Sequence, residues 1–128
     1  MIDLQSMVGT MPTTLGMLTQ LEVLKLVQIG LTGWIPMELG DLSQLTELDL
    51  GANVLASTVP MHLSQLSKLE QLLLYGNMAL IGSIPQELGD LTNVKFVDVQ
   101  HSGLSGSIPY LWCERNVEVL IVGSGMHC

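Results

Sequence analysis

The chain has 128 residues, which is enough for one domain, and its formal net charge is −8. Hydrophobic residues make up 48% of it and aromatic residues only 4%, so we expect an aliphatic core. Charged residues make up 12%, which excludes the composition of a disordered chain. The basic residues Lys25, Lys68, Lys95 and Arg115 lie far apart. This excludes the basic stripe that nucleic-acid binding requires, and it disfavours an anionic membrane surface as a partner.

A unit of the form Gly-x-Ile-Pro recurs along the chain, and its prolines are Pro12, Pro36, Pro60, Pro85 and Pro109. Each unit from Pro36 onward follows a segment of the type Leu-x-x-Leu-x-Leu, whose last two leucines alternate as in a short strand with one buried face. The Gly-x-Ile-Pro unit predicts a second extended segment, and the Leu-Gly-x-Leu that follows predicts a tight helical or 3-10 turn. Stacked repeats would share one continuous core.

This pattern resembles the plant-type class of leucine-rich repeat, LxxLxLxxNxLxGxIPxxLGxL, over essentially the whole chain. The resemblance implies an α/β solenoid, a right-handed superhelix with short parallel strands on the concave face and 3-10 or short helical turns on the convex face. We expect one leucine-rich-repeat domain, 1–128, with repeats at about 1–20 (partial), 21–44, 45–68, 69–93, 94–116 and 117–128 (partial). Such repeats are similar to the ectodomains of receptor-like kinases and receptor-like proteins and to polygalacturonase-inhibiting proteins.

Asn53 and Asn77 occupy the position at which these repeats carry a buried Asn, whose amide can satisfy backbone groups at a turn between layers. The equivalent residues elsewhere are Gln5, Ile29, Ser102 and Gly125. Of these, only Ser102 offers a partial substitute, so we expect looser packing near both ends.

The first repeat, aligned by the 24-residue period, begins in the middle of a strand, with no polar cap before Ile2. A fragment of a longer chain is one interpretation. The other is a small complete protein whose edge is covered by a partner or by self-association. The first residues also lack the basic and apolar regions of a secretory signal, and no stretch approaches the roughly 20 apolar residues that span a bilayer.

Cys113 and Cys128 both lie in the last repeat region, and the resemblance implies a disulfide there that closes the end of the core. An even number of cysteines favours a bridge outside the cell, whereas both would be free thiols in a reducing cytosol. A metal site formed by Cys113, His127 and Cys128 is disfavoured because tight zinc sites offer four ligands. No metal and no cofactor are expected.

Residues between the buried strand leucines face outward, and in stacked repeats they form columns on the concave face. The candidate binding residues are Lys25, Glu47, Asp49, Gln71, Leu73, Tyr75, Phe96, Asp98, Gln100 and His101. In the last repeat the columns are expected to continue with Val119, Ile121, Gly123 and Ser124. We expect Leu73, Tyr75 and Phe96 to lie close together as anchors, flanked by Glu47, Asp49 and Asp98. The alternative is ordinary surface variation, because exposed apolar residues and strand aromatics are common.

The sequence predicts a non-catalytic module that recognises a protein or peptide, since it carries no His-Glu-x-x-His, Gly-x-Ser-x-Gly or phosphate-binding loop. Such a module would belong to a cell-surface receptor or a secreted inhibitor, with the cytoplasm as the alternative location. The absence of an Asn-x-Ser/Thr acceptor weakens the extracellular interpretation slightly. Two other functions are self-association through the N-terminal edge and ice binding through the polar row Thr10, Thr58, Ser83 and Ser107, which Trp34 interrupts.

Overall fold

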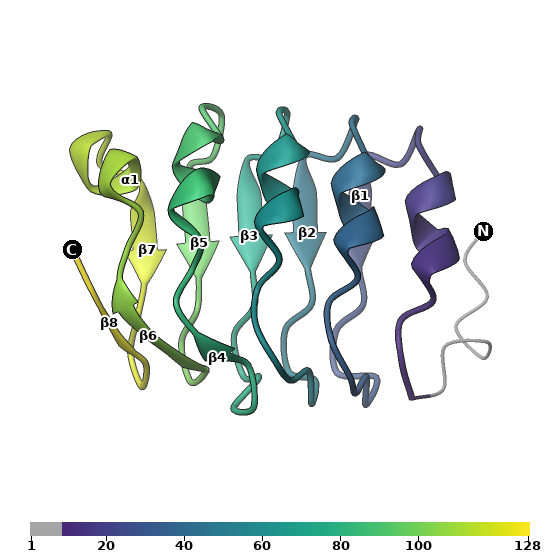
Figure 1. Ribbon diagram of the computed structural model, residues 1–128, viewed down its shortest axis with the longest axis horizontal. Helices are drawn as coiled ribbons and strands as arrows, with labels where there is room; N and C mark the ends of the chain where they lie inside the picture. The colour runs from purple at the N-terminus through teal and green to yellow at the C-terminus, as the bar shows by residue number, and fades with distance from the viewer. Residues whose placement is uncertain (1–8) are drawn as a thin grey trace.

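The computed structural model describes residues 9–128, which wind into a row of similar coils (Figure 1). Successive coils place short strands in a sheet drawn at the back and short helices in front of it. This arrangement confirms the expected α/β solenoid. The expected partial strand around Ile2 and the position of Gln5 lie outside the described residues.

The main sheet is parallel, and its order within the described residues follows the chain, β1-β2-β3-β5-β7. Its strands are β1 (Val23–Lys25), β2 (Glu47–Asp49), β3 (Gln71–Leu73), β5 (Phe96–Asp98) and β7 (Glu118–Leu120). Leu24, Leu48 and Leu72 pair in register and point into the core, so their neighbours on both sides point outward. The side of the main sheet that faces away from the core is called the sheet face below.

A short helix follows the Ile-Pro segment of each coil. These are the 3-10 helices η2 (Thr13–Met17), η3 (Met37–Asp41), η4 (Met61–Gln65) and η5 (Gln86–Asp90), and the α-helix α1 (Tyr110–Glu114). A Cβ on Gly40 would lie 2.4 Å from the backbone oxygen of His62, so glycine at this position lets η3 approach η4. The Leu-Gly pair in the repeat therefore sets the spacing of the helices.

A second parallel sheet, β4-β6-β8, forms where the chain passes from the main sheet to the helices. Its strands are β4 (Ile81–Gly82), β6 (Gly103–Ser107) and β8 (Gly125–His127). Isolated bridges, Thr10 to Thr32 and Ser57 to Leu80, continue the same pairing in earlier coils. The expected second extended segment is thus present. In the coil of β6 it begins at Gly103, before the Gly-x-Ile-Pro unit that starts at Gly106.

The core lies between the sheets and the helices and consists of leucine layers. Leu48, Leu50, Leu55, Leu63 and Leu66 of one coil are all 0% exposed. Burial of each such side chain contributes about 1.5–3 kcal/mol, and the next coil repeats the same contacts. No coil can bury this face alone, so the stability of the solenoid depends on stacking.

The buried asparagines connect successive coils by hydrogen bonds. The Asn77 side-chain oxygen accepts the backbone N–H of Leu55 at 3.0 Å, and its amide donates to the carbonyl oxygens of Leu50 at 3.0 Å and Leu74 at 3.1 Å. Asn53 bonds in the same way one coil earlier, to residues that include Leu31 and Leu26. Each amide thus joins two neighbouring turns of the solenoid.

Two further positions of this ladder carry serine. The Ser102 hydroxyl donates to Val99 O at 2.8 Å, and the Ser124 hydroxyl donates to Ile121 O at 2.8 Å. The expected assignment of Gly125 to this position is therefore wrong, because Ser124 occupies it. Ile29, at the start of the ladder, is 41% exposed.

The last coil is shorter than the others, and the expected register within it is wrong by one residue. β5 pairs with β7 so that Phe96 meets Glu118 and Asp98 meets Leu120. Glu118 and Leu120 therefore face outward, whereas Val119 and Ile121 pack against the core. The physical reason is that α1 replaces the 3-10 helix and the chain re-enters the sheet sooner.

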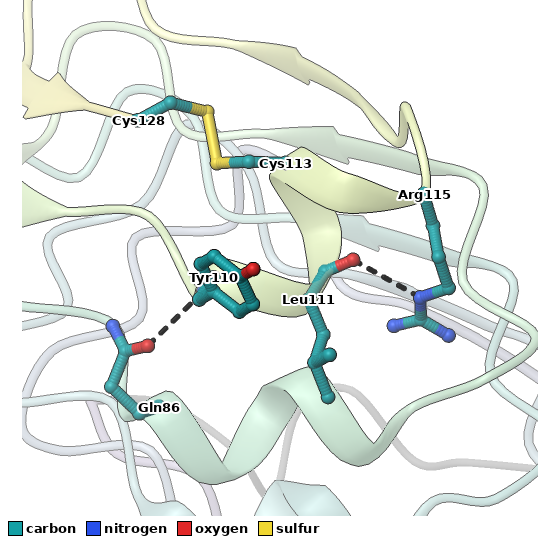
Figure 2. Close-up of a disulfide and its surroundings, with 6 residues drawn as sticks. All are labelled: Gln86, Tyr110, Leu111, Cys113, Arg115 and Cys128. Atoms are coloured by element: carbon teal, nitrogen blue, oxygen red, sulfur yellow. Dashed lines mark hydrogen bonds between the residues drawn. A yellow bond between two sulfur atoms is a disulfide. The ribbon is translucent and has the colours of Figure 1, made fainter.

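A disulfide joins Cys113 in α1 to Cys128 just after β8, with a Cα–Cα distance of 6.1 Å (Figure 2). This confirms the bridge that the resemblance implied. Trp112 lies beside Cys113 and is 0% exposed, so α1 covers the end of the core. The Arg115 guanidinium donates to Gly89 O at 2.8 Å and ties α1 to the preceding coil.

Candidate ligand-binding face

Four columns of side chains run across the sheet face, one residue from each coil. Register and backbone hydrogen bonds define them as Val23, Glu47, Gln71, Phe96, Glu118; then Lys25, Asp49, Leu73, Asp98, Leu120; then Val27, Gly51, Tyr75, Gln100, Val122; then Gln28, Ala52, Gly76, His101, Gly123. The first four coils follow the expected columns. In the last coil, Glu118, Leu120, Val122 and Gly123 replace the expected Val119, Ile121, Gly123 and Ser124, because of the register change.

Tyr75 occupies the centre of the sheet face, and its ring lies over Gly51 of the preceding coil. A Cβ on Gly51 would be 2.1 Å from Cζ of the tyrosine ring, so the ring fills the space that glycine leaves free. Leu73, two residues before Tyr75, is half-buried on the same face. The result is a fixed aromatic and aliphatic surface in the middle of the solenoid.

Two carboxylates flank this centre. Asp49 is 9% exposed and accepts the backbone N–H of Gly51 at 3.0 Å. Asp98 is half-buried and accepts both the backbone N–H and the side-chain N–H of Gln100, at 3.1 and 3.2 Å. These bonds hold both side chains near the sheet, and the sequence had indicated only exposed charges at the two positions.

Glu47 and Lys25 form an ion pair across β1 and β2, with 3.2 Å between Nζ and Oε2. The expected negative charge of Glu47 is therefore partly neutralised, and the acidic part of the sheet face centres on Asp49 and Asp98. A half-exposed ion pair of this kind contributes little to stability.

The expected cluster of Leu73, Tyr75 and Phe96 forms only in part. Phe96 pairs with Gln71, four residues before Tyr75 along the strand direction, which corresponds to about 13 Å. The Tyr75 ring also leans toward Gly51, away from the strand that carries Phe96. Leu73 lies between the two aromatic residues, so the surface is a row and not a single cluster.

His101 lies at the edge of the sheet face, in a left-handed turn with φ of 54°. A Cβ on Gly123 would be 2.4 Å from its Nδ1, so the imidazole packs over the glycine of the next coil. Tyr75 and His101 therefore pack in the same way: the ring of each covers a glycine of a neighbouring coil. Within residues 9–128, no group of three or more His, Cys, Asp or Glu side chains is placed to hold a metal ion.

The phenol of Tyr75 has its pKa raised above the ordinary 10.0, first by burial and then by the negative charges of Asp49 and Asp98. The neutral phenol thus adds stability that is fully present below pH 10.0 and is lost as pH rises through the folded-state pKa.

We expect Asp98→Asn to lower the pKa of Tyr75, because it removes one of the repelling charges. An ultraviolet absorbance titration in a Tyr110→Phe background measures this, and an unchanged titration would contradict the placement of Asp98.

Comparison with solved structures identifies the class of this fold. The chain resembles the Arabidopsis receptor kinase HAESA in complex with the peptide hormone IDA and the co-receptor SERK1, at 31% identity and a TM-score of 0.85, over 92% of this chain and 20% of that one. It matches the ectodomain of the Arabidopsis thaliana receptor kinase SOBIR1 at 31% identity and a TM-score of 0.79, over 92% of this chain and 64% of that one. It also matches the Arabidopsis thaliana membrane receptor kinase GASSHO1/SCHENGEN3 at 30% identity and a TM-score of 0.83, over 94% of this chain and 15% of that one.

The chain is therefore a leucine-rich-repeat solenoid. Its repeats are similar to those of these plant receptor-kinase ectodomains, as the sequence indicated. It spans between 15% and 64% of the length of these ectodomains. No protein-family model matches the chain, and no curated protein matches it by sequence. Among residues 9–128, no helix has both the length and the apolar character needed to cross a bilayer.

Proposed function

We propose that the chain is part of a cell-surface or secreted plant-type receptor and binds a peptide or protein on its sheet face. The observation that carries this proposal is the Tyr75 ring, which is held over Gly51 next to Leu73 and between the carboxylates of Asp49 and Asp98. Aromatic side chains on a rigid surface are typical binding anchors. The solenoid provides the rigidity, and residues 1–128 would act as one domain within a longer chain.

The charges on the sheet face favour a ligand with a cationic group. Asp49 and Asp98 lie in the same column, one coil to either side of Leu73. An ammonium or guanidinium group above Leu73 would approach both carboxylates and form charge-assisted hydrogen bonds with them. Gln71, Gln100 and His101 would supply hydrogen bonds around this centre.

Two of the similar structures, which were solved with bound partners, support a peptide or protein as the ligand. HAESA was solved with the peptide hormone IDA, and GASSHO1/SCHENGEN3 with CASPARIAN STRIP INTEGRITY FACTOR 2. We infer a non-catalytic role for this chain, with any signalling activity in other parts of the parent protein. Extracellular exposure of the parent protein is consistent with the Cys113–Cys128 disulfide.

A displayed library of random peptides, selected on the immobilised protein, tests this proposal. We expect the selected peptides to be rich in Lys, Arg and aromatic residues, and a Tyr75→Ala/Asp98→Asn variant to bind them at least tenfold more weakly, since anchor residues contribute about 2 kcal/mol or more. Gly51→Ala should also weaken binding, because the new methyl group displaces the Tyr75 ring without removing it. Thr92→Ala, at an exposed turn outside the sheet face, is the control. Selected peptides that bind all variants equally would refute the proposal.

A further inference from the structure

A groove lies on another side of the solenoid, away from the sheet face, with a volume of about 750 Å³. Its walls come from the Ile-Pro segments and the first residues of η3, η4 and η5, which Figure 1 shows in front of the main sheet. Residues from Thr13 to Glu87 line it, so it crosses four successive coils. At about 4.8 Å per coil, this corresponds to about 14 Å, the length of about four extended residues.

Three exposed apolar side chains line this groove: Trp34, Met37 and Met61, which are 69%, 54% and 52% exposed. The repeats themselves show that the fold does not require these residue types. The positions equivalent to Trp34 carry Thr10, Thr58, Ser83 and Ser107, and those equivalent to Met37 and Met61 carry Thr13, Gln86 and Tyr110. Exposed apolar residues that exceed the needs of the fold indicate a surface that a partner covers.

The charge of the groove is negative. Glu38 and Glu87 line it, and neither forms an ion pair with another residue in the range 9–128. Within the described residues the lining includes His62 but no Lys or Arg. A neutral apolar partner would leave both carboxylates uncompensated, whereas a cationic partner would pair with them.

We propose that this groove binds an extended segment of a partner protein in which large apolar side chains alternate with Lys or Arg. In an extended segment successive side chains point to opposite sides, so the apolar ones would turn toward one wall of the groove and the cationic ones toward the other. The apolar side chains would cover Trp34, Met37 and Met61, and the cationic ones would reach Glu38 and Glu87. The indole of Trp34 also attracts a cation placed over its face. This surface is separate from the sheet face, so one chain could bind two partners at once.

The two tryptophans make the groove directly observable. Trp34 is exposed, whereas Trp112 is fully buried, so quenching of fluorescence by acrylamide reports on Trp34. The probe is a synthetic peptide of alternating Leu and Lys, with a Leu–Glu peptide and a Gly–Lys peptide of equal length as controls. We expect the Leu–Lys peptide to protect Trp34 from acrylamide and the two controls to leave it exposed. No protection by the Leu–Lys peptide, or equal protection by the Leu–Glu peptide, would overturn the proposal.

Variants that use residues from the other repeats test the same surface while preserving the fold. Trp34→Thr/Met37→Thr/Met61→Gln should bind a fluorescein-labelled Leu–Lys peptide at least tenfold more weakly, and so should Glu38→Gln/Glu87→Gln. Thr92→Ala, outside both surfaces, should bind it unchanged. In Tyr75→Ala/Asp98→Asn the Leu–Lys peptide should still protect Trp34 from acrylamide, which separates this surface from the sheet face. A concentration-dependent dimer that the triple variant abolishes would show that a second copy covers the groove, and it would refute the basic segment as occupant.

Discussion

Replacement of Asn77 by Ala should lower the free energy of unfolding by about 3 kcal/mol or more. The side chain is 0% exposed and bonds to Leu55 N, Leu50 O and Leu74 O. Alanine would leave these backbone groups buried without a partner, at a cost of about 1–3 kcal/mol for each group that water cannot reach. Asn77→Asp should be as damaging, because it removes the amide donor and buries a charge. Urea unfolding followed by far-ultraviolet circular dichroism gives the difference.

The matched control for this experiment is Asn93→Ala. Asn93 also donates to a backbone oxygen, that of Ser67 at 2.8 Å, but this bond is exposed to solvent. Water replaces it, so we expect a loss within about 0.5 kcal/mol. If both variants lost the same small amount, the asparagine ladder would not be a source of stability in this solenoid.

The fold could be predicted from the sequence because the repeats of one chain can be aligned with one another. Leu24, Leu48 and Leu72 recur at one period, and a side chain that recurs at one period in a stacked structure must occupy the same place in each layer. The same logic failed in the last coil. There the period shortens, and Val119, which was expected on the sheet face, packs against the core, whereas Leu120 faces outward. Only the position of α1 decides between them.

Features that depend on contacts between particular side chains were beyond the sequence pattern. Asp49 was expected to be an exposed charge, yet the bond to Gly51 N and the neighbouring Tyr75 ring bury it. Trp34 was interpreted as an interruption of a polar row, although it lines a groove together with Met37 and Met61. Periodicity shows which residues share a column, but it does not show which columns enclose a hollow.

Removal of the disulfide by Cys113→Ser/Cys128→Ser should cost about 3 kcal/mol, the value expected for a loop of 15 residues. The loss should be local at first, because each coil of a solenoid contacts only its neighbours. The backbone N–H of Ile108 donates to His127 O and depends on β8 remaining in place, so it should exchange with deuterium faster. The N–H of Leu50, bonded to Leu73 O in the middle of the main sheet, should be unaffected under native conditions.

Fluorescence gives a second test of the same change. In a Trp34→Thr background only Trp112 remains, and it is fully buried beneath the bridged end of the solenoid. Without the disulfide, acrylamide should reach Trp112 before the main sheet unfolds, since α1 and β8 are then joined only by non-covalent contacts. If Trp112 stayed protected until global unfolding, packing of α1 against η5 would be sufficient to close the core, and the disulfide would contribute only to the entropy of the unfolded chain.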